Sequence, residues 1–544
     1  MVDPGAGEAD ARARAQAHAG ARRLGHGADL LQLDRAAAPG RGLTSWLAEA
    51  LRAGIRDGRL RPGTALPATR VLADDLGVSR GVVVEAYQRL REEGLVSGRS
   101  GAGTAILPGA AGSARVAGTV GVTEIPGADE ATGALSRAEP SRMADAAGLG
   151  GAPGLGVSPD DPLALPRRWG ADAEIDLSPG VPDLSAFPRA AWLRAERAAL
   201  NEASPADLGY GDPRGNEPLR AALAGWLART RGLRTGPEAI VVTAGVAQAL
   251  ALMAQTLRGR GHTRIAVENP GSRGTRDELA HWGLVPRPVT VDADGLDVAE
   301  LVRSEAGAVA VTPAHQFPTG VVLSPDRRRD LLDWAAAGGL IIEDDYDAEF
   351  RYDRAPVPAL HASAPGQIAY AGSVSKTLAP GMRLGWLVPP PELYADIVRA
   401  KHASDLGAPA LPQLVLARLI TSGGLEQHIR QVKIRQRRRR DALLGALRVQ
   451  LPEARVQGIP AGLHLLVTFP GRTGDLDDTA LAARLRADGV LVHALSRHRD
   501  QAGRAAPEIP GLVLGYAAHT PDQLRTGGRR IARAVRDFPW LRPF

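Results

Sequence analysis

Lysine occurs only three times among the 544 residues of this chain, at Lys376, Lys401 and Lys433, although lysine and arginine together number 66. Lys376 follows the short apolar run 368–371 and lies among small and hydroxylated residues, in the order Gly-Ser-Val-Ser-Lys-Thr. Arginine does not deprotonate, so only lysine can serve where a neutral amine must attack a carbonyl. The pattern favours Lys376 as an imine-forming amine, and a surface lysine is the alternative interpretation.

A second set of reactive side chains is the acidic run from Glu343 to Asp347, which includes Tyr346 and follows the apolar residues 340–342. Acidic residues at the carboxyl end of a parallel strand lie where α/β sheets bind ligands. Carboxylates so close together repel one another and need a cation, a metal ion or water. The run alone is therefore compatible with a cationic partner, with a Mg²⁺ site or with a solvated acidic loop.

A third candidate is an anion site. Residues 239–242 form a short β-rich run, small residues follow at 243–247, and a helical pattern continues to Leu257. A strand, a tight turn and a helix start present free backbone N–H groups and the positive end of a helix dipole. Many α/β crossovers share this pattern, so it is only a weak indication of a phosphate site.

The elements that must position these residues alternate between short apolar runs and helical patterns from about residue 171 to the end. This alternation is typical of an α/β domain. Residues 1–41 and 109–170 are rich in Ala, Gly and other residues that build no core, and no aromatic residue occurs between Tyr87 and Trp169. We interpret them as a disordered tail and a flexible linker.

Residues 42–108 form a separate patterned module. Thr44, Thr69 and Ser79 are expected to start three helices, glycines at 58, 77 and 94 to end them, and residues 95–107 to form a hairpin. Two short helices joined through a Gly-containing turn are typical of a helix-turn-helix, whose second helix enters the major groove. The residues so placed are Ser79, Arg80 and Gly81, with Arg70 and Arg99 positioned for phosphates. A generic three-helix domain is the alternative.

Composition excludes several other classes of protein. There is no cysteine, so disulfides, thiolate metal sites and a cysteine nucleophile are ruled out. The N-terminus has no apolar signal segment, and no run of 18 apolar residues could span a membrane. The net charge of +6 is too small for such a length to indicate nucleic-acid binding. We expect a cytoplasmic protein without membrane contact.

The string LPATRVLADDLGVSRGVVVEAYQRLREEGLVSGRSGAGT closely resembles the DNA-binding domain of GntR-family transcription regulators. The resemblance covers nearly all of residues 42–108. It implies a winged helix-turn-helix that binds double-stranded DNA, with Arg70, Ser79, Arg80 and the wing-tip Ser100-Gly101 at the DNA. Gly81 and Val84 depart from the more polar residues common at those positions.

The region from about 175 to 540 is similar to fold-type I aminotransferases, and three of its segments resemble the MocR subgroup, in which a GntR-type domain precedes an aminotransferase-like domain. Those segments are TPAHQFPTG, IIEDDYDAEFRY and GSVSKTLAPGMRLGW. The resemblance implies pyridoxal 5′-phosphate as cofactor, bound by the domain over 171–544. Lys376 would be the Schiff-base lysine, Asp344 the partner of the pyridinium nitrogen and Tyr346 that of the phenolic oxygen. The phosphate would be held by Arg383, Ser373 and the backbone of Gly245, Val246 and Ala247, and the pocket lined by Gln248, His315 and Gln316.

The same resemblance implies a homodimer, because Tyr210 matches a tyrosine that reaches the partner subunit's phosphate. Two departures distinguish this chain from working enzymes. Ser272 stands where relatives usually carry an aromatic residue, and the strand from Gly511 to Tyr516 has no arginine to grip a substrate carboxylate. We therefore expect a pyridoxal-phosphate-dependent transcription regulator that senses the cofactor or an amine or amino acid reacting with it. A working aminotransferase with an accessory DNA-binding domain is the alternative.

Overall fold

The computed structural model describes residues 38, 42–57, 59–60, 63–93, 95–99, 103–107, 173–500 and 509–538. The expected tail over 1–41 and linker over 109–170 thus fall almost entirely outside the described residues, as do the wing-tip residues Ser100 and Gly101. No helix within the described part of the chain is long and apolar enough to cross a membrane.

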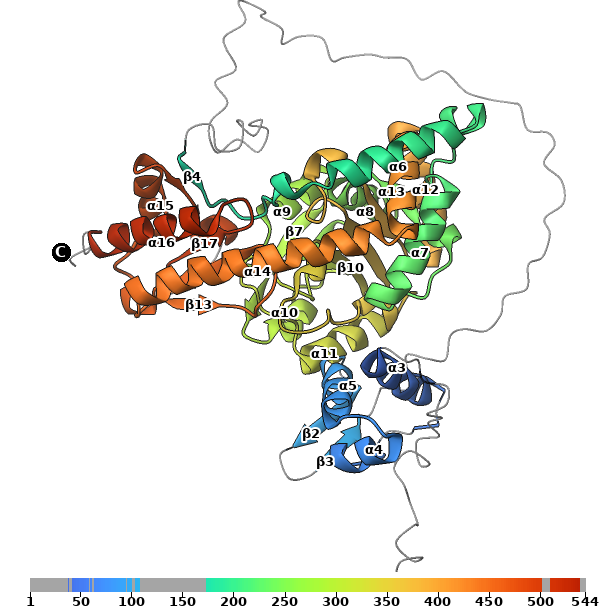
Figure 1. Ribbon diagram of the computed structural model, residues 1–544, viewed down its shortest axis with the longest axis horizontal. Coiled ribbons are helices and arrows are strands. Elements are labelled where there is room, and N and C mark those ends of the chain that lie inside the picture. The colour runs from blue at the N-terminus through green and yellow to red at the C-terminus, as the bar shows by residue number, and fades with distance from the viewer. Residues whose placement is uncertain are drawn as a thin grey trace, which may run out of the picture.

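The N-terminal module is three helices with a small antiparallel sheet (Figure 1). The helices are α3 (Leu43–Arg56), α4 (Thr69–Leu76) and α5 (Arg80–Glu92), and the sheet has the order β1 (Ala65–Leu66), β3 (Gly103–Ile106), β2 (Val96–Arg99). Fully buried apolar side chains from every helix, such as Leu51, Leu72 and Leu90, form one core. This is the winged helix-turn-helix that the sequence predicts.

The described ends of these helices follow the sequence with one exception, whereas Gly58 and Gly94, the expected ends of α3 and α5, lie outside the described residues. Gly77 ends α4 in the left-handed conformation at φ 59°, and Ser79 occupies the N-cap position of α5. The prediction that Thr44 caps the first helix is wrong, because α3 begins at Leu43 with Gly42 before it. Gly42 has φ 80°, a left-handed conformation that glycine adopts without steric cost.

The C-terminal region is built on a large sheet with the strand order β5-β12-β11-β10-β9-β6-β7-β8. Its strands are β5 (Val241–Thr243), β6 (Arg264–Asn269), β7 (Val285–Asp292), β8 (Gly295–Leu296), β9 (Ala308–Val311), β10 (Leu340–Asp345), β11 (Ile368–Ser373) and β12 (Gly385–Val388). Strands β7, β6, β9, β10 and β11 run parallel, β12 is antiparallel to β11 and β5, and β8 is antiparallel to β7.

Helices cover both faces of this sheet, because alternate strand residues point to opposite sides. Ile265 and Val267 pack with α8 (Val246–Gly259), α9 (Arg273–His281) and α12 (Tyr394–Asp405). Ala266, between them, packs on the other face with α10 (Val298–Arg303) and α11 (Pro325–Ala336). Apolar residues at successive positions of a strand are what a parallel sheet buried on both faces requires.

A second, smaller sheet closes the C-terminal end. Strands β13 (Arg455–Gln457), β14 (His464–Thr468), β17 (Gly511–Gly515) and β16 (His493–Ala494) form it, while β15 (Val490–Leu491) pairs with β4 (Ile175–Asp176). The long helix α14 (Gly424–Gln450) lies against α16 (Pro521–Arg536), and α15 (Asp478–Ala487) packs with them, as Figure 1 shows. Helices α6 (Arg189–Glu202), α7 (Glu217–Arg231) and α13 (Ala410–Thr421) form another cluster at the β5–β12 end of the large sheet.

The sheet topology brings the three sequence motifs together. Strands β5, β11 and β10 point the same way, since β12 is antiparallel to both of its neighbours. Thr243, Asp345 and Ser373, the last residues of these strands, therefore lie at one edge. Ligands of α/β sheets bind outside the carboxyl ends of the strands, so this edge is where a site is expected.

Candidate functional site

Lys376 lies in the turn that follows β11, with its amine directed inward. Its Nζ donates to the carbonyl oxygen of Gly180 at 2.6 Å. Gly180 has φ 90°, and a Cβ there would approach the amine to 3.3 Å, so a glycine suits this close contact. Burial lowers the pKa of Lys376, and the carboxylates of Asp347 and Asp344 oppose that effect. A buried lysine with a lowered pKa is the kind that acts as a nucleophile.

The other two lysines lie elsewhere and serve different roles. Lys401 is fully buried on α12 and donates to both carboxylate oxygens of Asp405, at 2.5 and 2.6 Å. Lys433 lies within the long helix α14. Lys376 is thus the lysine at the carboxyl edge of the sheet, and the surface-lysine interpretation is wrong for it.

Asp344 is the acidic residue of the run that faces the same space as Lys376. Its Oδ1 is buried and has no hydrogen-bond partner among the described residues. Burial, and next the nearby charge of Asp345, raise the pKa of Asp344 to about 7, while the charge of Lys376 lowers it. A buried carboxylate oxygen without a partner is costly, so it indicates a place where a ligand supplies the donor.

The neighbours of Asp344 point to the opposite face of β10 and are satisfied by the protein. Asp345 accepts from Arg231 Nε at 2.5 Å and Nη2 at 3.0 Å, and from the Tyr370 hydroxyl at 2.5 Å. Glu343 accepts from the backbone N–H groups of Leu360 and His361, both at 2.9 Å. The interpretation as a solvated acidic loop is therefore wrong. The cation that the run requires is the guanidinium of Arg231, and Asp344 alone remains for a ligand.

Tyr346 is positioned by a buried histidine and carboxylate. His315 Nδ1 lies 2.9 Å from Asp347 Oδ2 and 3.1 Å from the Tyr346 hydroxyl. The ligand atoms of His315, Asp347 and His464 lie within 4.8 Å of one another, and the hydrogen bond between His315 and Asp347 already joins two of them. The cluster holds the phenol of Tyr346 at the same edge as Asp344.

The anion cradle forms at the turn between β5 and α8. Gly245 precedes α8 with φ 86°, and no side chain caps it. The Arg383 guanidinium donates to the carbonyl oxygen of Ala244 and would lie 3.2 Å from a Cβ on Gly245. The buried Ser373 hydroxyl accepts from Ser375 N at 3.3 Å. The first N–H groups of α8, from Val246 and Ala247, a guanidinium and a serine thus gather at one helix start, as the sequence predicts for a phosphate.

Two residues expected to line the pocket serve the scaffold instead. Gln248 accepts from Ala244 N at 2.8 Å and donates to Asp405 at 2.8 Å, which fixes the turn before α8. Gln316 is buried, donates to Pro270 O at 2.9 Å and accepts from the Thr319 hydroxyl at 2.6 Å. All polar atoms of the Gln316 amide are used, so Gln316 has no free group for a ligand.

Sequence reasoning missed Glu268, which lies near Asp344. Glu268 is buried, and burial raises its pKa to about 7 although Thr312 donates to it at 2.6 Å. Glu268, Ser272 and Asp344 line one cavity together with Leu250 and Thr312. Gly180 was missed too, and the only signal for it is the Ser-Pro-Gly-Val-Pro turn in which it stands. Ser272 caps α9 by accepting from Thr275 N at 3.2 Å, so it has a structural role at the cavity wall.

Tyr210 is 95 % exposed and lies in the segment between α6 and α7. Leu193, Leu200 and Leu208 nearby in sequence are also exposed large hydrophobic residues. A run of exposed apolar side chains of this kind is typical of a surface that another protein molecule covers.

The residues predicted to contact DNA are accessible. Arg70, Ser79, Arg80 and Gly81 are all exposed at the starts of α4 and α5. Arg80 Nε donates weakly to the Thr69 hydroxyl at 3.4 Å, which joins the two helix starts. Arg99 ends strand β2, and the structure describes its backbone only.

Fold and site together define a two-part protein: a winged helix-turn-helix module, followed by an α/β domain whose lysine, aspartate and tyrosine converge at the carboxyl edge of a sheet. Comparison with known proteins agrees with this division. Residues 43–106 match the gntR family of bacterial regulatory proteins, and residues 173–525 match the aminotransferase class I and II family.

Among curated proteins, the chain is 32 % identical over 486 residues to the probable rhizopine catabolism regulatory protein MocR of Rhizobium meliloti, covering 88 % of this chain and 91 % of MocR. It is 34 % identical over 492 residues to the pyridoxine biosynthesis transcriptional regulator PdxR of Corynebacterium glutamicum, covering 90 % and 95 %. Among solved structures, it resembles Pyrococcus horikoshii kynurenine aminotransferase with a TM-score of 0.61 and 26 % identity, over 68 % of this chain and 91 % of that one. The chain belongs to the MocR-type gntR-family transcription regulators, which carry an aminotransferase class I and II domain.

Proposed function

We propose that this protein is a DNA-binding transcription regulator whose aminotransferase-like domain binds pyridoxal 5′-phosphate and senses either that cofactor or an amine or amino acid that reacts with it. The observation that carries the proposal is the unpartnered Oδ1 of Asp344, buried at the edge of the sheet that also holds the amine of Lys376. A protonated ring nitrogen is the donor that this oxygen lacks.

The residues at the site fit this cofactor. Lys376 would hold its aldehyde end, Asp344 its ring nitrogen and Tyr346 its ring hydroxyl. Arg383, Ser373 and the start of α8 would hold its phosphate, because a guanidinium and free helix N–H groups both favour a dianion. When bound, pyridoxal phosphate supplies an aldehyde that reacts with primary amines. The protein's part is to lower the pKa of Lys376 by burial, which favours its neutral form, and to orient the ring between Asp344 and Tyr346.

The proposal includes a homodimer in which Tyr210 serves the partner subunit's cofactor site. Its 95 % exposure in a single chain supports this, since so large an aromatic residue is seldom left fully in water without a partner. The DNA-binding partner is double-stranded promoter DNA, contacted by the exposed starts of α4 and α5.

The second candidate function is a working aminotransferase, which the complete set of Lys376, Asp344 and Tyr346 favours. Against it, strand β17 supplies Val513 to an apolar cluster with Phe317, Leu466 and Leu495, and no arginine occurs in Gly511–Gly515. Turnover depends on holding the substrate in one orientation, and a bidentate arginine clamp is the usual device. Sustained turnover of ordinary amino-acid and keto-acid pairs would identify the enzyme.

Reduction of the protein with borohydride in the presence of pyridoxal phosphate, followed by peptide mapping, tests the proposal. We expect the cofactor on Lys376 in the wild type and in Lys401→Arg and Lys433→Arg variants, and no label in Lys376→Arg. Labelling at Lys401 or Lys433, or no label in the wild type, would overturn the cofactor assignment.

A further inference from the structure

The winged helix-turn-helix module contacts the aminotransferase-like domain on one side only. Helix α3 and the C-terminal part of α5 face that domain, with α11 closest in Figure 1. The starts of α4 and α5, where Arg70 and Arg80 are exposed, belong to the other end of the module. The module is therefore seated with its DNA-contacting end free.

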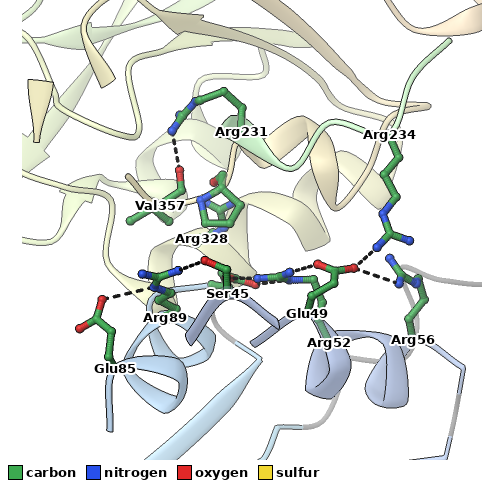
Figure 2. Close-up of polar contacts among 12 residues, drawn as sticks. Ser45, Glu49, Arg52, Arg56, Glu85, Arg89, Arg231, Arg234, Arg328 and Val357 are labelled. Carbon is green, nitrogen blue, oxygen red and sulfur yellow. Dashed lines mark hydrogen bonds and ion pairs between the residues drawn. The ribbon is translucent and has the colours of Figure 1, made fainter. Parts of the chain in front are cut away.

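The contact is built from opposite charges (Figure 2). Glu49 of α3 forms an ion pair with Arg234, which follows α7. Arg234 and two further arginines of the aminotransferase-like domain, Arg328 and Arg354, form what we call the basic seat. Burial lowers the pKa of Arg354, and the negative charge of Glu85 on α5 acts in the opposite direction. Glu49 thus joins the module to an arginine of the other domain, while Arg52 and Arg56 of the module pair with the same carboxylate.

Arg328 is the buried centre of the basic seat. It is 3 % exposed, its Nε has no hydrogen-bond partner in the part of the chain that the structure describes, and burial lowers its pKa. The charges that most oppose this are Glu343, on the cofactor strand, and Glu93, on the module. Glu93 is itself buried and accepts from Arg52 Nε at 2.8 Å and Nη2 at 2.7 Å. If the module left, Arg328 would lose the nearby charge of Glu93. A buried guanidinium that loses one of its neighbouring carboxylates destabilises the protein.

The basic seat is connected to the cofactor strand through the segment 357–358 and Arg231. Arg328 Nη2 donates to Pro358 O at 2.9 Å, and Arg231 Nη1 donates to the adjacent Val357 O at 2.7 Å. The same Arg231 holds Asp345, the residue after Asp344. One segment, residues 357–358, therefore lies between the module's seat and the strand that presents Asp344.

We propose that the basic seat is a docking site for residues 43–107 of this protein, and that docking fixes how the DNA-contacting end is presented. The DNA-binding test of this proposal rests on the proposed function, whereas the cross-linking test of the docked arrangement does not. Among the described residues, the ion pair that joins the module to the other domain is Glu49–Arg234, at the exposed ends of both side chains, so the module can be released and seated again. The occupant is specified by charge: Glu49 pairs with Arg234, and Glu93 and Glu85 bring negative charge toward Arg328 and Arg354.

The structural test uses the rarity of lysine. In an Arg234→Lys variant, zero-length carbodiimide coupling should join the introduced lysine to Glu49, and peptide mapping should identify the link. Arg229→Lys is the matched control, because Arg229 lies near the end of α7, shortly before Arg234, and pairs with Glu426 at 3.0 Å, within its own domain. A link from position 234 to Glu49, within one chain or between the two chains of a dimer, supports docking. The link at position 229 without any link from 234 to the module would overturn it.

The functional test compares Arg234→Glu with Arg229→Glu in the full-length protein. Arg234→Glu should weaken binding to DNA with two half-sites roughly tenfold, since attraction at the seat becomes repulsion. Binding to a single half-site should be unchanged, and Arg229→Glu should change neither. Glu49→Arg combined with Arg234→Glu should restore the paired-site affinity. Unchanged paired-site binding in Arg234→Glu would overturn the proposal, whereas failure of the wild type to bind any half-site would contradict the proposed function instead.

Discussion

At the scale of single residues, Asp344 is kept in a state that is unfavourable for the unliganded protein. Its pKa is raised to about 7 by burial, whereas an aspartate in an unfolded chain titrates near 4. A carboxyl group whose pKa is higher in the folded protein lowers stability as the pH rises from about 4 through about 7. At pH 8 the cofactor-free protein is therefore destabilised by the full free energy of keeping an ionised Asp344 buried.

We predict that Asp344→Asn stabilises the cofactor-free protein at pH 8, by on the order of 2 kcal/mol, and that this gain disappears near pH 4. The same substitution should strongly weaken pyridoxal phosphate binding, because the amide cannot balance a protonated ring nitrogen. Thermal unfolding of the cofactor-free protein at pH 4.5 and pH 8, with a spectroscopic cofactor titration, measures both effects.

Glu343→Gln is the matched control on the same strand. Its carboxyl pKa is also raised to about 7 by burial, but both oxygens accept backbone N–H groups. An amide offers only one acceptor oxygen, so Glu343→Gln should destabilise the protein at pH 8. Equal stabilisation by both substitutions would show that Asp344 is not distinguished by its missing partner.

At the scale of elements, the turn from β5 into α8 brings the phosphate cradle together. We predict that Arg383→Ala lowers the affinity for pyridoxal phosphate at least tenfold and leaves that for pyridoxal, which lacks the phosphate, nearly unchanged. A hydrogen bond to a charged group contributes about 1.5–3 kcal/mol, which sets this range. Arg258→Ala, near the other end of α8, is the control and should affect neither ligand. Equal losses for both ligands would place Arg383 away from the phosphate.

The starts of α4 and α5 form the second functional element. Replacing Arg70 or Arg80 by alanine should weaken DNA binding and reduce the slope of log K against log salt by about one, as expected when one phosphate contact is lost. Arg59→Ala, at an exposed arginine of the same module paired with Asp57, should leave the slope unchanged. Titrations at several salt concentrations measure this, and cofactor binding should be normal in all three variants. An unchanged slope in both helix variants would contradict the predicted docking mode.

The elements were predictable where a local pattern determines them. The alternation of apolar runs and helical patterns predicted the α/β domain. The glycines that were expected to end helices, and Ser79 at the expected beginning of one, predicted the helix-turn-helix. The convergence of Lys376, Asp344 and Arg383 was implied by resemblance and is produced by strand order, which no local pattern encodes. For the same reason Arg231 was missed: its contact with Asp345 spans 114 residues in sequence. The resemblance assigned Gln248 and Gln316 to the pocket, because matching motifs does not reveal which polar atoms the protein itself already satisfies.

At the scale of the whole molecule, a short series of contacts connects the cofactor strand to the DNA-binding module. Asp345, Arg231 and the segment 357–358 lead from β10 to the basic seat, and Glu49 and Glu93 continue into the module. A signal between two sites requires an element that both sites bias. In our account that element is the seated module, whose orientation depends on the basic seat.

The most direct test of the central claim is to titrate the full-length protein with DNA carrying one half-site and with DNA carrying two, each with and without pyridoxal phosphate. Two tethered modules make the second contact intramolecular, so the paired site should bind more tightly, by about 10²-fold or more. We predict that pyridoxal phosphate, or its reaction with an amine, changes the paired-site affinity and leaves the half-site affinity nearly unaltered. Equal responses of the two DNAs, or no response from either, would contradict control of DNA binding through the cofactor domain.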